Sequence, residues 1–584
     1  MTAYAVLLSV VALLVLLIRG RIAPAILFTA WAAAYYLAGL VSEREWLSGY
    51  TNPALITLVL LLLVSLALER SPLLDRFSDL VLKGGPARAT LRLSAVTAMF
   101  SAVLNNTAVV GALLGVVSKQ RRVAPSKLLI PLSYAAIIGG VTTLIGTSTN
   151  LVVNSFVIDA GLPPLGMFQF SLVGIPLALA CIAVMVLCSG LLPAHAPAER
   201  ENNQTYFLEA QITPGAPLAG RSIEQNGLRN LDGLFLLELE REGRLISPVG
   251  PDEILEEGDI LVFTGQVEKV QSLQQIRGLQ VFGTRADALL GSNLVEVVIS
   301  NESILPNHTL RGVDFRSQFD AGVVGIRRGD KRLTGQLGRI PLRVGDSLLL
   351  AVGPDFAQHR NIDRNFHLLD TGVLRPKLTP RQSTLALTGF ALAIAVSAIG
   401  VWPLLNCLLV LLAVLLATRI LSVSEMRRRF PFDLLVTIGS ALAIAKALES
   451  SGAAELVADS MRGVFDGYGV VGVFDGYGVV GAFVGVYLIT VVLTEVITNN
   501  AAAALAFPIA LSTARAFDVD PMPFVMAIAY GASAGFLIPF GYQTHLMVMS
   551  PGRYRTLDFI RIGLPVTLTY SAAVLLLVPT FFPF

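Results

Sequence analysis

Residues 104–107 read Leu-Asn-Asn-Thr, residues 498–501 read Thr-Asn-Asn-Ala, and both asparagine pairs are surrounded by small and apolar residues. An amide in such a setting needs hydrogen-bond partners. Capping of a helical hairpin or hydrogen bonding between helices would provide them, and both are common uses of polar residues in helix bundles. Because the pair occurs twice, at matching positions, we favour a binding role for it.

The composition excludes a soluble enzyme and indicates a membrane protein. Of the 584 residues, 54% are hydrophobic and 14% are charged, and the mean hydropathy is +0.69; about 25% would be charged in a soluble domain. Apolar stretches long enough to cross ~30 Å of hydrocarbon recur along the chain. They cover 4–18, 24–41, 53–69, 383–400, 403–421 and 561–580. The net charge of +2 gives no sign of nucleic-acid binding.

A polar insert divides the chain into separate domains. Between about residues 199 and 370, long apolar runs give way to short alternating strands broken by glycine and charge. A Gly-Asp turn at 258–259 and another at 345–346 each precede an apolar strand, which indicates a tandem repeat. We predict four domains: a first membrane half at 1–198, soluble α/β units at 199–285 and 286–372, and a second membrane half at 373–584.

The two membrane halves can be aligned with each other. Each is expected to contain three spans, a helical hairpin (90–118 and 479–513), an interrupted helix (127–158 and 523–549) and a last span. If each hairpin enters and leaves on one side, each half crosses the membrane an odd number of times, five, so the halves have opposite orientations. That is the inverted-repeat signature of secondary transporters.

Two further segments accompany the halves. We expect an amphipathic stretch at 72–83, before the first hairpin. A nine-residue sequence at 464–472 is repeated at once at 473–481, before the second hairpin, and we assign it no function.

Basic residues support this arrangement. In the first half, the Arg and Lys residues from Arg19 to Lys127 fall on one side of the membrane in this scheme, and only Arg44 falls on the other. By the positive-inside rule, that side is cytoplasmic. We therefore expect a multi-pass protein of the cell (inner) membrane with the soluble units in the cytoplasm.

Both interrupted helices break where hydroxyl and amide side chains gather. The first break reads Gly-Thr-Ser-Thr-Asn at 146–150 and the second Pro-Phe-Gly-Tyr-Gln-Thr-His at 539–545, each about 44 residues after its asparagine pair. A kink alone would explain one such break, but not two at one offset. Exposed carbonyl and side-chain oxygens can bind a hard cation such as Na⁺, and amide donors and helix N-termini can face an anion. One turn can therefore serve a cation site and an anion site.

These motifs resemble a known family. The tips Asn-Asn-Thr (105–107) and Asn-Asn-Ala (499–501) resemble the Ser-Asn-Thr motifs of the divalent anion:sodium symporter (DASS) family. The run at 539–544 is similar to the second break of its sulfate/dicarboxylate-type members, and the insert resembles the two TrkA-C (RCK C-terminal) domains of that branch. The resemblance implies a homodimer whose transport domains move as elevators.

The resemblance also implies the site residues. It implies one sodium ion held by Asn105, Asn106, Gly146 and Asn150, a second held by Asn499, Asn500 and Gly541, and an anion contacted by Thr107, Ser148 and Thr544, with Asn106 and Asn500 shared between cation and anion.

The tips depart from the family pattern in two ways. Asn105 and Asn499 replace serine, and Ala501 stands where the family has threonine. By that alignment, Ala501 matches Thr107. We therefore expect the first half to hold the anion more firmly than the second.

Three ionisable residues near the apolar segments have open roles. His545 stands where the family has Asn, and both a structural role and a role in proton dependence are open. Glu495, aligned with Ser101, is either a carboxylate at the root of the hairpin or an attractor of cations. Lys446, near a helix end, is expected to snorkel.

The sequence therefore predicts a secondary transporter that couples symport of a small divalent anion, such as sulfate or a dicarboxylate, to Na⁺. An arsenite-type or proton-coupled transporter of the same superfamily is one alternative, and an ion channel or sensor regulated by the TrkA-C pair is another. Against a channel, the tips form an inverted pair rather than a ring. We expect no enzyme activity, no cofactor besides the coupling ion (Na⁺, or H⁺ in the alternative), and an unidentified small ligand of the TrkA-C pair as a further partner.

Overall fold

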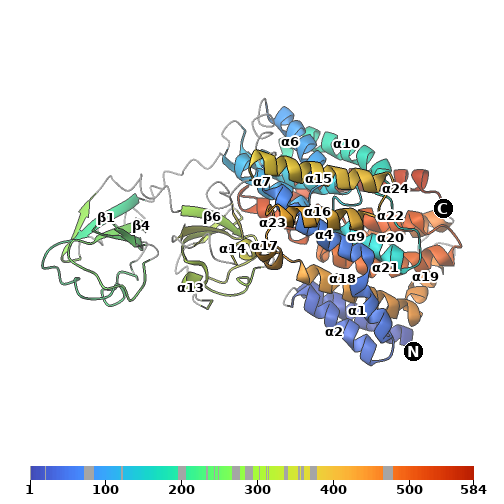
Figure 1. Ribbon diagram of the computed structural model, residues 1–584, viewed down its shortest axis with the longest axis horizontal. Helices are drawn as coiled ribbons and strands as arrows, with labels where there is room; N and C mark the ends of the chain where they lie inside the picture. Colours follow the sequence, from blue (N-terminus) through green and yellow to red (C-terminus); the bar gives the residue numbers. More distant parts are fainter. Residues whose placement is uncertain are drawn as a thin grey trace.

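The computed structural model describes two helical blocks and most of the insert between them (Figure 1). The described residues are 2–19, 22–71, 85–119, 123–194, 206–368, 378–463 and 478–584, without 230, 232–233, 243, 247–248, 266–275, 283–293, 301–302, 311, 314, 330, 334–339, 353–355 and 357–360. The predicted amphipathic stretch at 72–83, most of the duplicated segment at 464–481 and all three predicted domain boundaries lie outside the described residues.

The first helical block has the order of elements that the sequence predicts. Its α-helices are α1 (Thr2–Arg19), α2 (Pro24–Leu37), α3 (Glu43–Ser48), α4 (Pro53–Glu69), α6 (Pro86–Ser101), α7 (Asn106–Lys119), α8 (Leu129–Gly140), α9 (Ser148–Asp159) and α10 (Ser171–Leu187). The predicted hairpin is α6 and α7, and the predicted interrupted helix is α8 and α9. Pro86, at the start of α6, follows Gly85, and a proline costs nothing at this position because its missing N–H would be unpaired there anyway.

The second helical block repeats this order. Its α-helices are α15 (Pro380–Ala398), α16 (Leu404–Ala417), α17 (Val423–Arg428), α18 (Phe432–Ser450), α19 (Ala453–Gly463), α20 (Gly478–Val496), α21 (Asn499–Ala516), α22 (Met522–Gly531), α23 (Gln543–Met549) and α24 (Thr556–Phe581). Two details differ from the sequence prediction. Helix α19 is not among the segments that the sequence predicts, and the second break begins at Ala532 instead of Pro539.

Five helical segments are long and apolar enough to cross a membrane by length and composition. Among the described residues these are Thr2–Arg19, Glu43–Glu69, Ser171–Leu191, Gly478–Val496 and Thr556–Phe581. Other apolar helices, such as α2 and α16, are shorter. The lengths agree with a polytopic membrane protein, and the number of crossings stays a prediction.

The helices of the two blocks pack against each other around one hydrophobic core. Helix α2 packs against α18 and α16 against α4, whereas α6 packs against α8 and α20 against α22. Helix α10 packs against α24. The α6–α8 contact is very close, because a Cβ added to Gly139 would lie 2.3 Å from the carbonyl oxygen of Ala98. Only glycine allows the two backbones to approach this far.

The described part of the insert consists of two antiparallel five-stranded sheets and short helices. The first sheet has the order β3-β2-β4-β1-β5 and the second β10-β6-β9-β7-β8, which is the same topology. The strands are β1 (Tyr206–Ile212), β2 (Leu234–Arg241), β3 (Arg244–Ile246), β4 (Ile260–Gly265), β5 (Leu279–Phe282), β6 (Leu294–Ile299), β7 (Ala321–Arg328), β8 (Lys331–Leu333), β9 (Ser347–Val352) and β10 (Phe366–Leu368). The predicted Gly-Asp turns stand directly before β4 and β9.

The same buried ion pair supports each sheet. Arg241 donates to both carboxylate oxygens of Asp259 (2.9 and 2.8 Å), and Arg328 donates in the same way to Asp346 (2.7 and 2.7 Å). Both carboxylates are buried, and the hydrogen bonds that Arg241 donates to Asp259 raise the pKa of Arg241. Since each pair joins a strand end to a Gly-Asp turn, it fixes the turn that starts the following strand.

The second sheet lies against the helical body, and the first lies beyond it (Figure 1). Val298 of β6 is buried in the hydrophobic core of the helices, while the rest of the second sheet has a core of its own. Both ends of the chain lie at the opposite end of the helical body (Figure 1).

Candidate functional site

The first hairpin tip is built around Asn105 and Asn106. The Oδ1 atom of Asn105 accepts a hydrogen bond from the backbone N–H of Thr107 (3.1 Å) and so caps the start of α7. The amide of Asn106 is buried, 2.7 Å from Ser101 Oγ. When the amide nitrogen of Asn106 faces Ser101, this nitrogen also donates to the carbonyl oxygens of Ala136 (3.0 Å) and Gly146 (3.3 Å). Oxygen atoms of three segments therefore converge on this amide.

Two glycines make this convergence possible. A Cβ on Gly140 would lie 2.4 Å from Asn106 Oδ1, and a Cβ on Gly146 would lie 2.5 Å from the carbonyl oxygen of Gly140 and 2.8 Å from that of Ser101. Any larger residue would push these backbone oxygens apart. The structure therefore brings together Asn106 and Gly146, two of the four residues expected at the first sodium site.

Asn150, another of these four, lies in the first turn of α9. Its Nδ2 donates to the carbonyl oxygen of Thr143 (2.8 Å), and its buried Oδ1 has no hydrogen-bond partner within the described part of the chain. Thr143 Oγ1 in turn donates to the carbonyl oxygen of Ala102 and accepts from the N–H of Gly146 (3.1 Å). A buried oxygen without a partner is costly, which makes Asn150 Oδ1 a natural ligand position.

The second tip has the same design with a different register. Thr494 Oγ1 lies 3.0 Å from Asn499 Oδ1, five residues on, just as Ser101 Oγ lies beside Asn106, also five residues on. Helices α7 and α21 begin at Asn106 and Asn499. Asn499 therefore corresponds to Asn106, and the alignment of the two asparagine pairs in the sequence is wrong by one residue.

This register changes two assignments. The counterpart of Thr107 is Asn500, whereas Ala501, which was aligned with Thr107, is buried in the packed helix. The counterpart of Ser101 is Thr494 instead of Glu495. A pattern of Asn-Asn alone could not decide the register, because either asparagine can start the helix.

Side chains at helix starts meet across the two halves. Thr107 Oγ1 donates to Gln543 Oε1 (3.2 Å), which joins the first turns of α7 and α23. Asn500 Oδ1 accepts from Ser148 Oγ (3.3 Å) and Thr149 Oγ1 (3.4 Å), which joins α21 to α9. All of these except Thr149 are half-buried, so a solute can reach them. Gln543 and Thr149 are residues that the sequence reasoning did not assign to the site.

Tyr542 connects the two meeting points. Its hydroxyl is buried and makes no hydrogen bond within the described part of the chain, but it lies among the side chains of Asn106 of the first tip, Asn499 of the second, Thr147 and Ser533. Thr147 and Tyr542 directly precede α9 and α23 and share an extended backbone (φ −132°, ψ 144° and φ −128°, ψ 131°). The two tips and the two breaks therefore form one polar centre.

A narrow cleft opens onto this centre from the first half. Asn105, Gly146 and Ser148 line its inner end. Its walls are Leu58, Leu61, Leu62, Ser65, Val103, Ile145 and Phe390. The combination of apolar walls and a polar end is typical of a site for a small solute.

Thr544 and Gly541 lie on the other side of the centre. The buried Oγ1 atom of Thr544 has no hydrogen-bond partner among the described residues. A Cβ on Gly541 would lie 3.0 Å from the carbonyl oxygen of Thr494. The structure therefore places Gly541 beside the second tip, as the predicted second sodium site requires.

His545 and Glu495 are both engaged with protein groups. The ring nitrogens of His545 lie 2.7 Å from Ser133 Oγ and 2.9 Å from the carbonyl oxygen of Gly535, which suits a neutral ring with its proton on Nε2. The Glu495 carboxylate accepts from the N–H groups of Leu537 and Ile538 (both 2.9 Å). Glu495 therefore lies near the end of α20 and pins the second break, and both roles considered for it, a hairpin-root carboxylate or a cation attractor, stay predictions.

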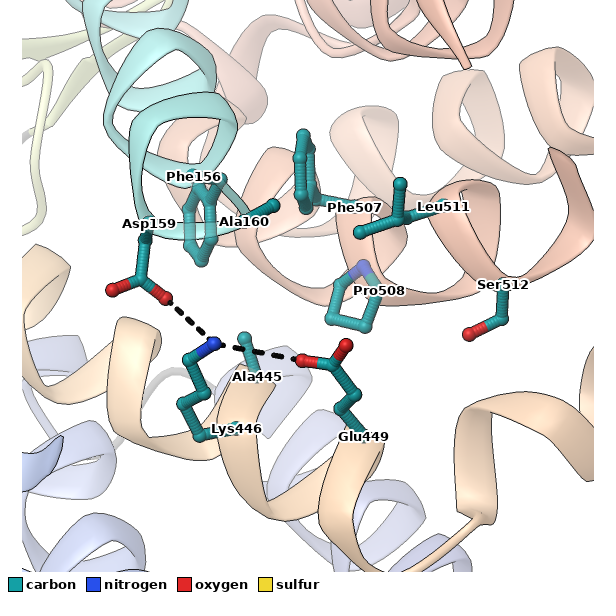
Figure 2. Close-up of a pocket in the computed structure, with 10 residues that line it drawn as sticks. All are labelled: Phe156, Asp159, Ala160, Ala445, Lys446, Glu449, Phe507, Pro508, Leu511 and Ser512. Atoms are coloured by element: carbon teal, nitrogen blue, oxygen red, sulfur yellow. Dashed lines mark ion pairs between the residues drawn. The ribbon is translucent and has the colours of Figure 1, made fainter. Parts of the chain in front are cut away.

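A second narrow cleft lies between α9, α18 and α21 (Figure 2). Lys446 Nζ is 3.3 Å from Asp159 Oδ2 and 3.6 Å from Glu449 Oε2, and Arg515 Nη1 is 2.8 Å from Glu449 Oε1. Lys446 was expected to snorkel, but it bridges two helices. Because these side chains are partly exposed, each pair contributes little stability.

Metal clusters of the usual kind are not found in the described ranges, where no three His, Cys, Asp or Glu side chains gather. Any cation bound at the polar centre would have to be held by amide, hydroxyl and carbonyl oxygens. These suit a hard, weakly bound cation better than a transition metal.

Comparisons with known proteins match the chain to transporters. The chain is 32% identical over 573 residues to a protein of Chlamydomonas reinhardtii named for the response to sulfur deprivation, covering 94% of this chain and 96% of that one. It is 29% identical over 575 residues to an uncharacterised transporter of Synechocystis sp. (94% and 92%). It is also 28% identical to the sodium/sulfate cotransporter 1 of Chlamydomonas reinhardtii, over 62% of this chain and 41% of the other.

A family model described as citrate transporter matches residues 11–531. That range includes both hairpins, the insert and the first break. The match confirms the prediction of a transporter instead of an enzyme. The chain belongs to the citrate transporter family.

Proposed function

We propose that the protein is a secondary active transporter that couples symport of a small divalent anion, such as sulfate or a dicarboxylate, to Na⁺. One observation carries the proposal: half-buried side chains at the starts of four helices meet in two pairs, α7 with α23 through Thr107–Gln543 and α9 with α21 through Ser148–Asn500. Helix N-termini carry partial positive charge and free N–H groups, and together they attract an anion without any basic residue.

The oxygen atoms around Asn106 support a cation site. Ser101 Oγ and the carbonyl oxygens of Ala136 and Gly146 converge on the Asn106 amide. Asn150, four residues after Gly146, has a buried Oδ1 atom without a hydrogen-bond partner among the described residues. If the amide of Asn106 turned its oxygen toward this group, these atoms would offer Na⁺ an all-oxygen site. A second site at Asn499, Asn500 and Gly541 would follow the same design.

The two kinds of site explain coupling. Moving a divalent anion into a protein interior is costly because its charge loses hydration. Cations bound beside it offset that charge, so each ion binds better when the other is present. The names of relatives support this pairing, since one is a sodium/sulfate cotransporter and another, from Caenorhabditis elegans, a sodium-dependent low-affinity dicarboxylate transporter.

The finer architecture is part of the proposal. The matching helix contacts of the two blocks, with α2 on α18 and α16 on α4, support an inverted repeat with re-entrant hairpins and alternating access around the polar centre. We propose further that the protein works as a homodimer with elevator-type movement in the inner membrane. The two sheets, with their identical topology, would be TrkA-C domains in the cytoplasm.

Uptake into proteoliposomes tests the function. Radiolabelled sulfate and succinate are offered to purified protein under an inward sodium gradient, under potassium in its place, and under a proton gradient alone. We expect uptake of one of the two anions that requires sodium. Uptake of neither anion would remove the proposal, and uptake driven by the proton gradient alone would replace sodium with protons as the coupling ion.

A further inference from the structure

The second sheet touches the short helix that carries part of the polar centre. Ser550, directly after α23, donates from Oγ to the carbonyl oxygen of Gly345 (2.6 Å) and accepts from the N–H of Gly329 (3.3 Å). Gly329 lies in the turn between β7 and β8, and Gly345 lies in the Gly-Asp turn before β9. Ser550 is fully buried in this contact.

Both turns are pressed against the helix end. A Cβ on Gly345 would lie 3.4 Å from Leu546 Cδ2, and a Cβ on Gly329 would lie 3.0 Å from the carbonyl oxygen of Tyr554. Both glycines have positive φ angles, +81° and +57°, that L-residues rarely adopt. The turns therefore match the helix end in shape as well as in hydrogen bonding.

Helix α23 is short enough to transmit this contact to the polar centre. It runs from Gln543 to Met549, and a helix of this length spans about 10 Å. Gln543 at its start bonds Thr107, and Ser550 at its end bonds the sheet. No side chain in the described part of the chain caps its N-terminus. So short a helix has little stability of its own, and its position is set by its contacts at both ends and by its packing on α7 and α8.

The first sheet has the same turns but makes no such contact. Gly258 corresponds to Gly345 and has the same left-handed backbone (φ +88°), yet no described atom lies within 4 Å of a Cβ placed on it. Glu242, the counterpart of Gly329, is exposed. The turns thus keep their shape without a helix beside them, so the contact at Gly345 is a property of the second unit alone.

We propose that the second sheet holds α23 in the position that binds the anion, with Ser550 as the positioning residue. The inference rests on the proposed function, because it names what sets the affinity of that site. A change in the cytoplasmic unit moves Ser550, and α23 carries the movement over two helical turns to Gln543 and Thr544. The unit is therefore a control element of transport instead of a passive appendage.

A matched pair of variants tests the contact. Asparagine tolerates positive φ better than other residues, so Gly345→Asn and Gly258→Asn strain their turns equally. Only the side chain at position 345 meets the helix, at Leu546. We expect Gly345→Asn to raise the KM for the transported anion about fivefold, the effect of losing about one net hydrogen bond. The maximal uptake rate of this variant should stay within about twofold of the wild-type rate, because only one weak contact is lost.

Ser550 itself provides the second test. Ser550→Ala should raise KM in the same direction, and Ser550→Thr, which keeps the hydroxyl, should restore it. Unchanged KM in both Gly345→Asn and Ser550→Ala would overturn the inference, and so would an equal rise in Gly258→Asn. If the wild-type protein takes up neither anion, the proposed function fails, and melting temperatures then decide about the contact. A lower melting temperature for Gly345→Asn than for Gly258→Asn supports the contact between the second sheet and α23, and equal melting temperatures refute it.

Discussion

The register of the second tip gives the sharpest prediction about the anion site. The structure matches Asn500, and not Ala501, to Thr107. Asn500 Oδ1 accepts two hydrogen bonds from hydroxyls, at 3.3 and 3.4 Å, which is longer than the usual range of about 2.5–3.0 Å. At the low end of the usual range, about 0.5 kcal/mol each, Asn500→Ala loses about 1 kcal/mol. If these contacts hold the site in its binding geometry, KM rises about fivefold.

The opposite substitution separates the two alignments. The sequence alignment makes Ala501 a missing anion contact, so Ala501→Thr would lower KM. The structure instead places Ala501 in a fully buried helix surface, where the larger side chain costs about 1–3 kcal/mol of stability and adds no contact to the anion. Ala504→Thr, one turn further along the same helix, is the control for overpacking alone.

Initial uptake rates over a range of anion concentrations, together with melting curves, check these values. Ala501→Thr and Ala504→Thr should melt at a lower temperature, with the wild-type KM for the fraction that remains folded. A lower KM in Ala501→Thr, together with an unchanged KM in Asn500→Ala, would refute the structural register.

Three further predictions concern other parts of the site. Gly146→Ala should abolish sodium-stimulated uptake, because its Cβ would lie 2.5 Å from a backbone oxygen. Gly166→Ala is the control: no described atom lies closer than 3.8 Å to its Cβ, so sodium-stimulated uptake should be unchanged. Lys446→Met should change the uptake rate less than about fivefold, since each of its partly exposed ion pairs contributes about 0.2–1 kcal/mol. Adding Asp159→Asn to Lys446→Met should not change the uptake rate further. An additive loss of uptake in the double variant would contradict the ion pair between the two residues. His545→Asn should melt earlier but keep the wild-type pH profile of uptake, because both ring nitrogens already have partners, and a shifted profile would restore a role in proton coupling.

Much of the helical architecture could be predicted from the sequence because glycine and polar residues interrupt otherwise apolar runs. The first hairpin, expected at 90–118, is formed by α6 and α7 between Pro86 and Lys119. The second break was harder to place. Residues 532–535 read Ala-Ser-Ala-Gly and look helical, but Thr494 binds the carbonyl oxygen of Ala532 and Glu495 binds the N–H groups of Leu537 and Ile538. Tertiary contacts therefore open the helix earlier than its local sequence indicates.

The site could be predicted only in part, for a similar reason. The side chains at the tips and breaks were identified by their residue types, and the structure brings most of them to one centre. Their partners lie far away in the chain: Thr107 meets Gln543, and Ser550 meets the turn at Gly345. No local pattern encodes such pairs, so Gln543, Thr149 and Ser550 were not assigned by sequence reasoning.

The central claim is that sodium and a small anion cross the membrane together through one polar centre. The most direct measurement follows radiolabelled sodium and the radiolabelled anion at the same time in one set of proteoliposomes. We predict that adding the anion stimulates sodium influx, that sodium stimulates anion influx, and that Gly146→Ala abolishes both. Anion uptake with no accompanying sodium flux, or sodium flux that ignores the anion, would contradict the account.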